Sequence, residues 1–210
     1  MARWLALDAF GTLLEITTPV RPFVDLKKTL SQQPGLDLTD FSIQAMAHRH
    51  DLVSLAAHYG YQASAEDQQR WATGLEQELQ SIQPFSDAEV VVQQALLAGW
   101  NVVVCSNLAA PYTAAVDAFL APFVERYGRE RVATAYSCDV GYLKPRPAFF
   151  WTVEKQLGSK PGEMAMMGDR YVEDVCGPRA CRWKAFHVER SAGLDLLKGW
   201  AVLSKASQSE

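Results

Sequence analysis

The residues of this 210-residue chain that could do chemistry are polar side chains lying just beyond short apolar runs. They are Asp8, Ser106, Asn107, Lys144, Asp169 and Asp174. Each one alone has an ordinary structural explanation, such as a helix cap or a solvated loop charge. Gathered in one place, however, carboxylates with an ammonium and a hydroxyl group could bind a cation and attack an electrophile. That chemistry depends on the fold bringing these residues together.

Three of these residues are acidic. If Asp8, Asp169 and Asp174 share one pocket, their mutual repulsion raises their pKa values unless a cation compensates for it. An all-oxygen site with few carboxylates suits Mg²⁺. Such an ion would orient an anionic substrate while leaving the Asp8 carboxylate free to attack. We therefore expect Mg²⁺ as a cofactor.

Five apolar runs predict buried parallel strands, because each is continuous rather than alternating. They cover residues 4–7, 102–105, 132–136, 164–167 and 184–188. Segments of helical length, residues 109–123, 148–157 and 173–181, separate the last four. This alternation predicts an α/β fold with a doubly wound, Rossmann-like parallel sheet. Ligands of such sheets bind beyond the carboxyl ends of the strands, where the six polar residues lie.

The interval between the first two predicted strands is about ninety residues, far longer than a crossover connection needs. Its patterns predict helices over residues 20–33, 40–59 and 64–82, and a helix over residues 86–99 leads back to the sheet. A helical domain at residues 15–83 is therefore expected to interrupt a core of residues 1–14 and 84–210. The polar tail from Ser204 is expected to fray.

Four segments of the chain resemble, in order, the four motifs of the haloacid dehalogenase superfamily of hydrolases. They are Asp8-Ala9-Phe10-Gly11-Thr12-Leu13, Ser106-Asn107, Gly141-Tyr142-Leu143-Lys144-Pro145, and Gly168-Asp169 with Asp174. The helical insert lies where that superfamily places its cap domain, so the resemblance spans the whole chain. It implies that Asp8 is a nucleophile that forms an aspartyl-enzyme intermediate, which water then hydrolyses.

The catalytic and substrate-binding roles follow from this arrangement. Lys144 is expected to pair with Asp8 and with the anionic transition state, and the Ser106 hydroxyl to bind oxygens of the transferring group. Gly11 and Thr12 are expected to shape the turn after the nucleophile. These two residues and Asn107 are the expected substrate-binding residues.

The metal site implied by the resemblance has four contributors. Asp8 and Asp169 would ligate Mg²⁺ through their carboxylates, and Phe10 through its backbone carbonyl. Asp174 would act directly or through a water molecule.

Position 10 departs from the pattern of the superfamily's phosphatases. These enzymes resemble one another in carrying a second aspartate there as general acid and base, whereas this chain has Phe10. A positioned acid contributes about 10²–10⁴ in rate, so unactivated alkyl phosphates should react slowly.

Three functions remain open. A phosphatase-like hydrolase is favoured, because Asp169 and Asp174 beside the nucleophile demand a cation. A metal-independent 2-haloacid dehalogenase is the alternative, since such enzymes resemble this chain in having an aromatic residue at position 10 and their halide leaves without a proton. A binding or regulatory protein with little turnover is the third.

Composition limits the partners. Twenty Lys and Arg against twenty-four Asp and Glu give a net charge of −4 without a basic block, which argues against nucleic acid and membrane surfaces as partners. No apolar run approaches the roughly 20 residues of a membrane span, and the start of the chain does not resemble a signal peptide. We expect a cytoplasmic protein with a small-molecule substrate and four reduced cysteines; the sequence leaves the oligomeric state open.

Overall fold

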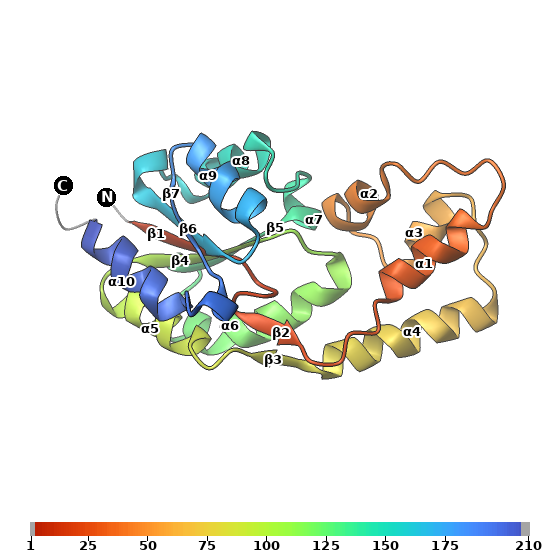
Figure 1. Cartoon of the computed structure of the whole chain (residues 1–210), viewed down its shortest axis with the longest axis horizontal. Helices are drawn as coiled ribbons and strands as arrows, with labels where there is room; N and C mark the ends of the chain where they lie inside the picture. Colours follow the sequence, from red (N-terminus) through yellow and green to blue (C-terminus); the bar gives the residue numbers. More distant parts are fainter. Residues whose placement is uncertain (1–2, 207–210) are drawn as a thin grey trace.

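The computed structural model describes residues 3–206, which form a parallel sheet flanked by helices and, to one side of it, a group of four helices (Figure 1). The sheet has five strands in the order β5-β4-β1-β6-β7. They are β1 Trp4–Leu7, β4 Asn101–Ser106, β5 Val132–Tyr136, β6 Met164–Gly168 and β7 Lys184–His187. All five predicted strands are present, with bounds that differ by no more than one residue.

The strand order reverses at β1. The chain runs from β1 through β4 to β5 on one side, then crosses back so that β6 and β7 lie on the other side. Leu7 is in register with Val104 of β4 and with Met167 of β6. The carboxyl ends of these three strands therefore meet at one edge, at the switch point where doubly wound sheets bind ligands.

Helices cover both faces of the sheet (Figure 1). One face carries α5 Ala88–Leu97, α6 Thr113–Tyr127 and α10 Leu196–Ala206; the other carries α7 Ser137–Val140, α8 Pro147–Leu157 and α9 Gly177–Ala180. Leu5 and Leu7 pack into the core of the first face, whereas Trp4 and Ala6 pack into the second. This alternation along β1 is the two-residue period of a strand buried on both sides.

The helical insert comprises α1 Pro22–Ser31, α2 Phe41–Ala47, α3 Leu52–His58 and α4 Ala65–Gln80. It has a hydrophobic core of its own, with Leu26, Leu30, Leu55 and Trp71 almost fully buried. A two-stranded antiparallel ribbon, β2 Leu14–Ile16 and β3 Ile82–Pro84, connects it to the sheet. The predicted domain boundaries fall within this ribbon, and the division into two domains stays a prediction.

The helix predicted over residues 40–59 is wrong, because the chain forms two helices there. His48 is extended, with φ −135° and ψ 155°, and ends α2. Asp51 then begins α3, since its side chain accepts the Ser54 N–H at 2.7 Å. A side chain that caps a new helix competes with continuation of the previous one.

Two other helices also differ from their predictions. The segment 109–123 begins with a 3-10 turn, Ala110–Tyr112, and α6 extends to Tyr127. The segment 173–181 is a wide π-type turn, Tyr171–Cys176, followed by the short α9. In the remaining predicted helices the ends differ by one or two residues, the usual uncertainty of helix termini.

The prediction of a frayed tail from Ser204 is wrong for the part that the structure describes. Helix α10 runs to Ala206, and Leu196, Trp200 and Leu203 bury its apolar stripe. Residues 207–210 lie outside the described part.

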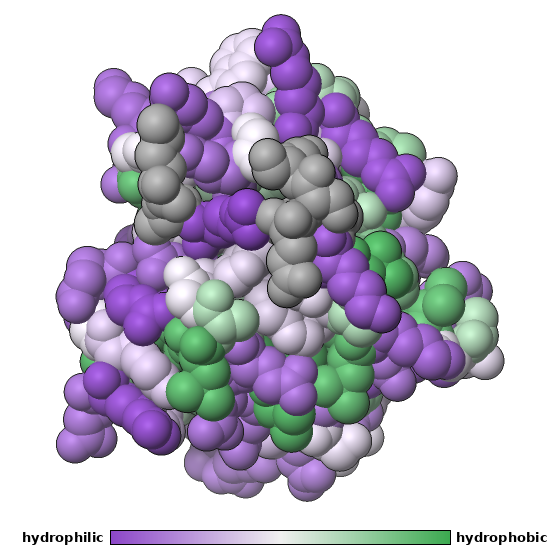
Figure 2. All heavy atoms as spheres, turned by 90° about the vertical axis from the view of Figure 1, so that its left-hand side faces the viewer, coloured by the Kyte–Doolittle hydropathy of each residue, from purple (hydrophilic) through white to green (hydrophobic). Residues whose placement is uncertain are grey.

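The surface at the end of the core away from the insert is mainly hydrophilic, with separate rather than continuous hydrophobic groups (Figure 2). Among the described helices, none is both long and apolar enough to pass through a lipid bilayer.

Candidate active site

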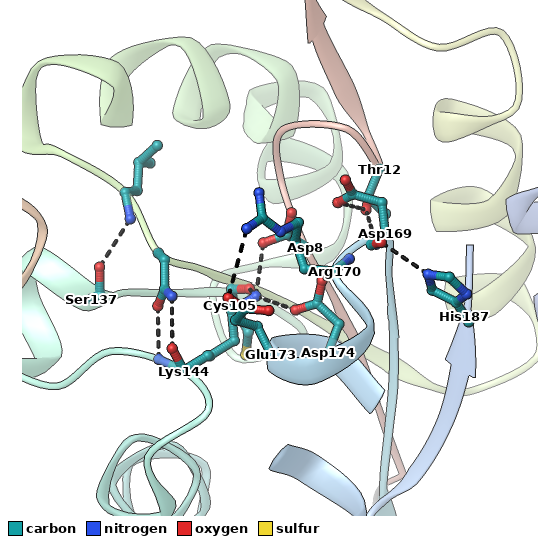
Figure 3. A network of polar contacts seen from close by, with 12 residues as sticks. Asp8, Thr12, Cys105, Ser137, Lys144, Asp169, Arg170, Glu173, Asp174 and His187 are labelled. Carbon is teal, nitrogen blue, oxygen red and sulfur yellow. Dashed lines mark hydrogen bonds and ion pairs between the residues drawn. The ribbon is translucent and has the colours of Figure 1, made fainter. Parts of the chain in front are cut away.

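Lys144 lies at the centre of the polar residues that follow the strands (Figure 3). Its Nζ donates hydrogen bonds to Asp8 Oδ1 at 2.8 Å, to Asp174 Oδ1 at 2.6 Å and to the Cys105 carbonyl at 2.7 Å. All three donors of the ammonium group are thus satisfied. Lys144, Asp8 and Asp174 are buried, so solvent screens these ion pairs poorly.

Asp174 reaches this group from the wide turn after β6. Its Oδ2 accepts the Arg170 N–H at 2.9 Å while its Oδ1 accepts from Lys144. The close approach depends on Gly168, because a Cβ at that position would overlap the Asp174 carboxylate. Both oxygens of Asp174 are therefore already hydrogen-bonded.

Asp169 faces Asp8 from the end of β6. The Thr12 hydroxyl donates to Asp169 Oδ1 at 3.3 Å and accepts the Asp169 N–H at 3.1 Å. Gly11 has φ +89°, and a Cβ there would lie 2.5 Å from the Asp169 carboxylate. The turn after Asp8 can pack against Asp169 only because residue 11 is glycine.

One carboxylate oxygen from each of Asp8, Asp169 and Asp174 lies within 4.8 Å of the other two. Burial raises the pKa of Asp8; the Asp174 charge raises it further, and Lys144 and the Ser106 hydroxyl oppose the rise. Burial and the charge of Asp8 likewise raise the pKa of Asp169. Burial alone would lower the pKa of Lys144, but the two carboxylates that it contacts hold that pKa above its ordinary value.

The site therefore has more negative than positive groups. Lys144 pairs with two of the three carboxylates, Asp8 and Asp174, and the charge of Arg170 only partly offsets the raised pKa of Asp169. The charged forms of Asp8 and Asp169 are therefore disfavoured. An all-oxygen donor set with excess negative charge fits a hard divalent cation such as Mg²⁺.

Ser106 is the last residue of β4 and Asn107 follows it, and their side chains make different contacts. The buried Ser106 hydroxyl lies close enough to the Asp8 carboxylate to lower its pKa. The Asn107 side chain instead clamps the backbone of Lys144: its amide donates to the Lys144 carbonyl at 2.9 Å, and its oxygen accepts the Lys144 N–H at 2.8 Å. Asn107 thereby holds the lysine loop in place, and its contact with substrate stays a prediction.

Phe10 lies where the chain turns away from Asp8. Its half-buried ring meets the Tyr112 ring edge-on, with the centroids 5.9 Å apart. Both rings line a cavity of about 510 Å³ between the insert and the carboxyl ends of the strands. The side chain at this position thus adds an apolar wall to the site.

Several residues that support the site gave no signal in the sequence. His187 Nε2 lies 2.9 Å from the Asp169 carbonyl (Figure 3). Arg190 donates to the Thr12 carbonyl at 2.6 Å and pairs with Asp87 at 3.0 Å, which fixes the turn after Asp8. These partners are separated by about 20 to 180 residues. Only the tertiary fold brings them together.

Two arginines, Arg170 and Arg49, pair with carboxylates outside the cluster of Asp8, Asp169 and Asp174. Arg170 has a largely exposed side chain that lies 3.8 Å from Glu173. Arg49 donates to both oxygens of Asp139, at 2.5 and 2.9 Å, and so joins the insert to the core.

Comparison with known proteins matches most of this chain to one family of hydrolases. The model of the haloacid dehalogenase-like hydrolase family matches residues 2–181. Among curated proteins, a phospholysine phosphohistidine inorganic pyrophosphate phosphatase from Xenopus laevis is 38% identical over 56 residues, which cover 25% of this chain. The match spans only about a fifth, 21%, of the length of that relative.

Solved structures with a similar fold include both phosphatases and dehalogenases. A phosphatase of this family from Thermococcus onnurineus is 19% identical with a TM-score of 0.59, covering 97% of this chain and 98% of its own. A family member from Bacteroides thetaiotaomicron, in complex with magnesium and inorganic phosphate, is 16% identical with a TM-score of 0.57, covering 90% and 95%. The L-2-haloacid dehalogenase from Xanthobacter autotrophicus is 18% identical with a TM-score of 0.57, covering 97% and 88%. At these identities the likeness concerns the fold alone.

Proposed function

The chain belongs to the haloacid dehalogenase-like hydrolase family, and on this premise we propose that it is a Mg²⁺-dependent phosphatase of a small phosphorylated molecule. The observation that carries the proposal is the cluster of Asp8, Asp169 and Asp174: one carboxylate oxygen of each lies within 4.8 Å of the others, and Lys144 pairs with two of the three. A metal-independent dehalogenase has no need for this excess of carboxylates. The activity of the Xenopus relative and the ligands of the Bacteroides structure agree with the proposal.

Asp8 and Asp169 are the side chains that would hold the metal, together with the backbone carbonyl of Phe10. Asp174 would act through a water molecule, because both its oxygens already accept hydrogen bonds. When bound, Mg²⁺ would neutralise negative charge on the phosphoryl oxygens.

Asp8 is the proposed nucleophile. Its carboxylate attacks phosphorus; the new oxygen–phosphorus bond forms as the bond to the leaving group breaks, and the leaving oxygen takes the electron pair. Lys144 and the Ser106 hydroxyl stabilise the negative charge of the transition state from fixed positions. Water then attacks the phosphorus of the aspartyl phosphate, which restores Asp8 and releases inorganic phosphate, and solvent accepts the proton.

Phe10 cannot donate a proton to the leaving oxygen. The leaving group must therefore depart as an anion or take its proton from solvent, and substrates with acidic leaving groups react fastest. The second step also lacks the usual base, so the aspartyl phosphate should accumulate during turnover.

The decisive experiment measures phosphate release from an aryl phosphate with and without Mg²⁺. Wild-type protein should release phosphate only with the metal, and Asp8→Asn should lose the activity while retaining the fold. Mass spectrometry of protein quenched during turnover should find a phosphoryl adduct on Asp8. Turnover without that adduct would contradict the covalent mechanism.

A dehalogenase is the second candidate, because Phe10 suits a halide leaving group that needs no proton. Metal-independent release of chloride from a 2-chlorocarboxylic acid, with no phosphate release from aryl phosphates, would establish it instead. The absence of both products would leave a binding or regulatory protein.

A further inference from the structure

The cavity beside Phe10 has the size and surface of a small-molecule site. Its volume of about 510 Å³ lies within the range of about 300–1,000 Å³ that such sites occupy. Its wall is largely apolar: Phe10, Phe23, Phe41 and Tyr112 contribute rings, and Met46 contributes an aliphatic thioether chain. Phe10 and Asn107 line the cavity and lie within two residues of Asp8 and Ser106, respectively. The leaving group of a molecule bound at Asp8 would therefore extend into this cavity.

Two cations, Arg21 and Lys27, also line the cavity. Both are exposed at its solvent side, and Lys27 Nζ lies 5.6 Å from the centroid of the Phe41 ring. Within residues 3–206, neither side chain is paired with a carboxylate. Cations left free at the edge of an apolar wall can bind an anionic group of a ligand by charge-assisted hydrogen bonds.

The backbone of Arg21 is held in an unusual conformation. Its φ of 62° and ψ of 55° are left-handed, which side-chain-bearing residues rarely adopt. Glu78 holds this backbone, because its Oε1 accepts the N–H groups of Val20 at 2.8 Å and of Arg21 at 2.6 Å. Strained residues of this kind persist where the surroundings enforce them, and they cluster at ligand sites.

Glu78 does not oppose an anion in the cavity as a free carboxylate would. Its second oxygen accepts the Tyr112 hydroxyl at 2.5 Å, so both oxygens are hydrogen-bonded. Tyr112 belongs to the core and Glu78 to the insert, and together they fix Arg21 relative to Phe10. The cavity thus has Phe10, which cannot donate a proton, at the end near Asp8. Aromatic side chains form its wall, and Arg21 and Lys27 lie at its solvent-exposed edge.

We propose that the substrate is an aryl phosphate that carries a carboxylate on the far side of its ring. The phosphate would lie at Asp8, the ring between Phe10 and the aromatic wall, and the carboxylate at Arg21 with Lys27 beside it. A phenolic oxygen leaves as a stabilised anion, which matches the lack of an acid at position 10. This inference rests on the phosphatase function proposed above.

The test compares two substrates of the same shape, 4-carboxyphenyl phosphate and 4-carbamoylphenyl phosphate, with Mg²⁺ present. Wild-type protein should show a kcat/KM at least about tenfold higher for the carboxylate, the effect of one charge-assisted hydrogen bond. Arg21→Gln should reduce the preference to less than about twofold, and Lys27→Gln should reduce it in part. Lys28→Gln is the matched control, since Lys28 is exposed on the same helix outside the cavity wall, and it should keep the full preference.

Calorimetry with 4-hydroxybenzoate and 4-hydroxybenzamide separates this inference from the phosphatase proposal, because binding needs no turnover. If neither phosphate is hydrolysed but the benzoate binds at least about tenfold more tightly in an Arg21-dependent way, the phosphatase proposal fails and the carboxylate site stands. Three outcomes would overturn the inference. The first is equal kcat/KM values for the two phosphates, and the second is equal or undetectable binding of 4-hydroxybenzoate and 4-hydroxybenzamide. The third is a preference for the carboxylate that survives both Arg21→Gln and Lys27→Gln.

Discussion

Single residues determine which reactions this site can support. In the proposed mechanism Asp8 is a buried nucleophile and Lys144 and Ser106 hold negative charge, and none of the three would supply a proton to the leaving group. By the resemblance to the superfamily's phosphatases, Phe10 stands at the position where those enzymes carry their acid. On this proposal, the range of substrates depends on the acidity of the leaving group.

Phe10→Asp should broaden that range. An aspartate there can protonate the leaving oxygen, so hydrolysis of an alkyl phosphate should rise by about 10²-fold or more relative to that of an aryl phosphate. The measurement is the dependence of kcat/KM on leaving-group pKa, which should become less steep. Phe10→Asn is the control of equal size; an equal gain in that variant would exclude proton transfer as the cause.

Gly11→Ala should weaken Mg²⁺ binding. The new Cβ would press against the Asp169 carboxylate at 2.5 Å, and a displaced or poorly oriented ligand typically costs about 10–100-fold in affinity. Titration calorimetry with Mg²⁺ measures the effect.

Gly99→Ala provides the matched control for this change. Gly99 also has a positive φ, +82°, but no heavy atom lies within 4 Å of the place that a Cβ would occupy there. Both substitutions strain the backbone, and of the two only the one at Gly11 brings a Cβ against Asp169 of the proposed metal site. Equal Mg²⁺ affinities in the two variants would contradict the proposal that Asp169 ligates the metal.

At the scale of elements, strand register brings the site together and helix caps hold the insert. The alignment of β1 with β4 and β6 places residues from distant parts of the chain at one edge of the sheet. In the insert, Ser64 and Asp67 form a capping box at the start of α4. The Asp67 carboxylate also accepts hydrogen bonds from Tyr61 and Arg70, each at 2.8 Å.

Asp67→Asn should destabilise the protein in a pH-dependent way. The hydrogen bond from Tyr61, with that from Ser64, lowers the pKa of Asp67 from 3.8 to about 2. Because the folded state holds the charged form more tightly, this stabilisation is present above about pH 4 and is lost as the pH falls towards 2.

Thermal unfolding of wild type and variant across this pH range is the measurement. The difference in Tm should be largest at neutral pH and shrink between about pH 4 and pH 2. Glu66→Gln, which removes an exposed charge from the same turn of α4, controls for the general effect of charge. A difference for Asp67→Asn that stays constant down to pH 2 would contradict the explanation.

At the scale of the whole molecule, polar contacts join the insert to the core. Arg49 pairs with Asp139, the Ser137 hydroxyl donates to the Met46 carbonyl at 2.5 Å, and the Tyr112 hydroxyl donates to Glu78. The first of these is exposed and the last is buried. Because solvent screens the exposed Arg49–Asp139 pair, it should contribute less to stability than the buried hydrogen bond between Tyr112 and Glu78.

A double-mutant cycle with Arg49→Ala and Asp139→Ala should find a coupling of only about 0.2–1 kcal/mol, because solvent screens an exposed pair. At 1 M salt, where the Debye length is about 3 Å, the coupling should fall further. Denaturant unfolding of the four proteins at two salt concentrations gives both values. A coupling above about 2 kcal/mol that ignores salt would mean that this pair dominates the contact between insert and core.

The sequence by itself determined the sheet and the identities of the residues at its edge. Five continuous apolar runs predicted the five strands, because burial on both faces leaves a local signature. The polar residues after the runs were identifiable for the same reason, since the carboxyl ends of neighbouring parallel strands meet at one edge. The helix predicted over residues 40–59 failed, because local capping by Asp51 interrupts a helical pattern without changing it.

The tertiary structure alone decided how the site is supported and what surrounds it. Arg190 reaches Thr12 across 178 positions and His187 reaches Asp169 across 18, and a hydrogen bond between such distant residues leaves no periodic pattern in the sequence. Arg21 and Phe10 face one cavity only because the insert folds back over the strand ends. Sequence patterns record how each segment is buried, whereas the packing of segments against one another determines which side chains meet.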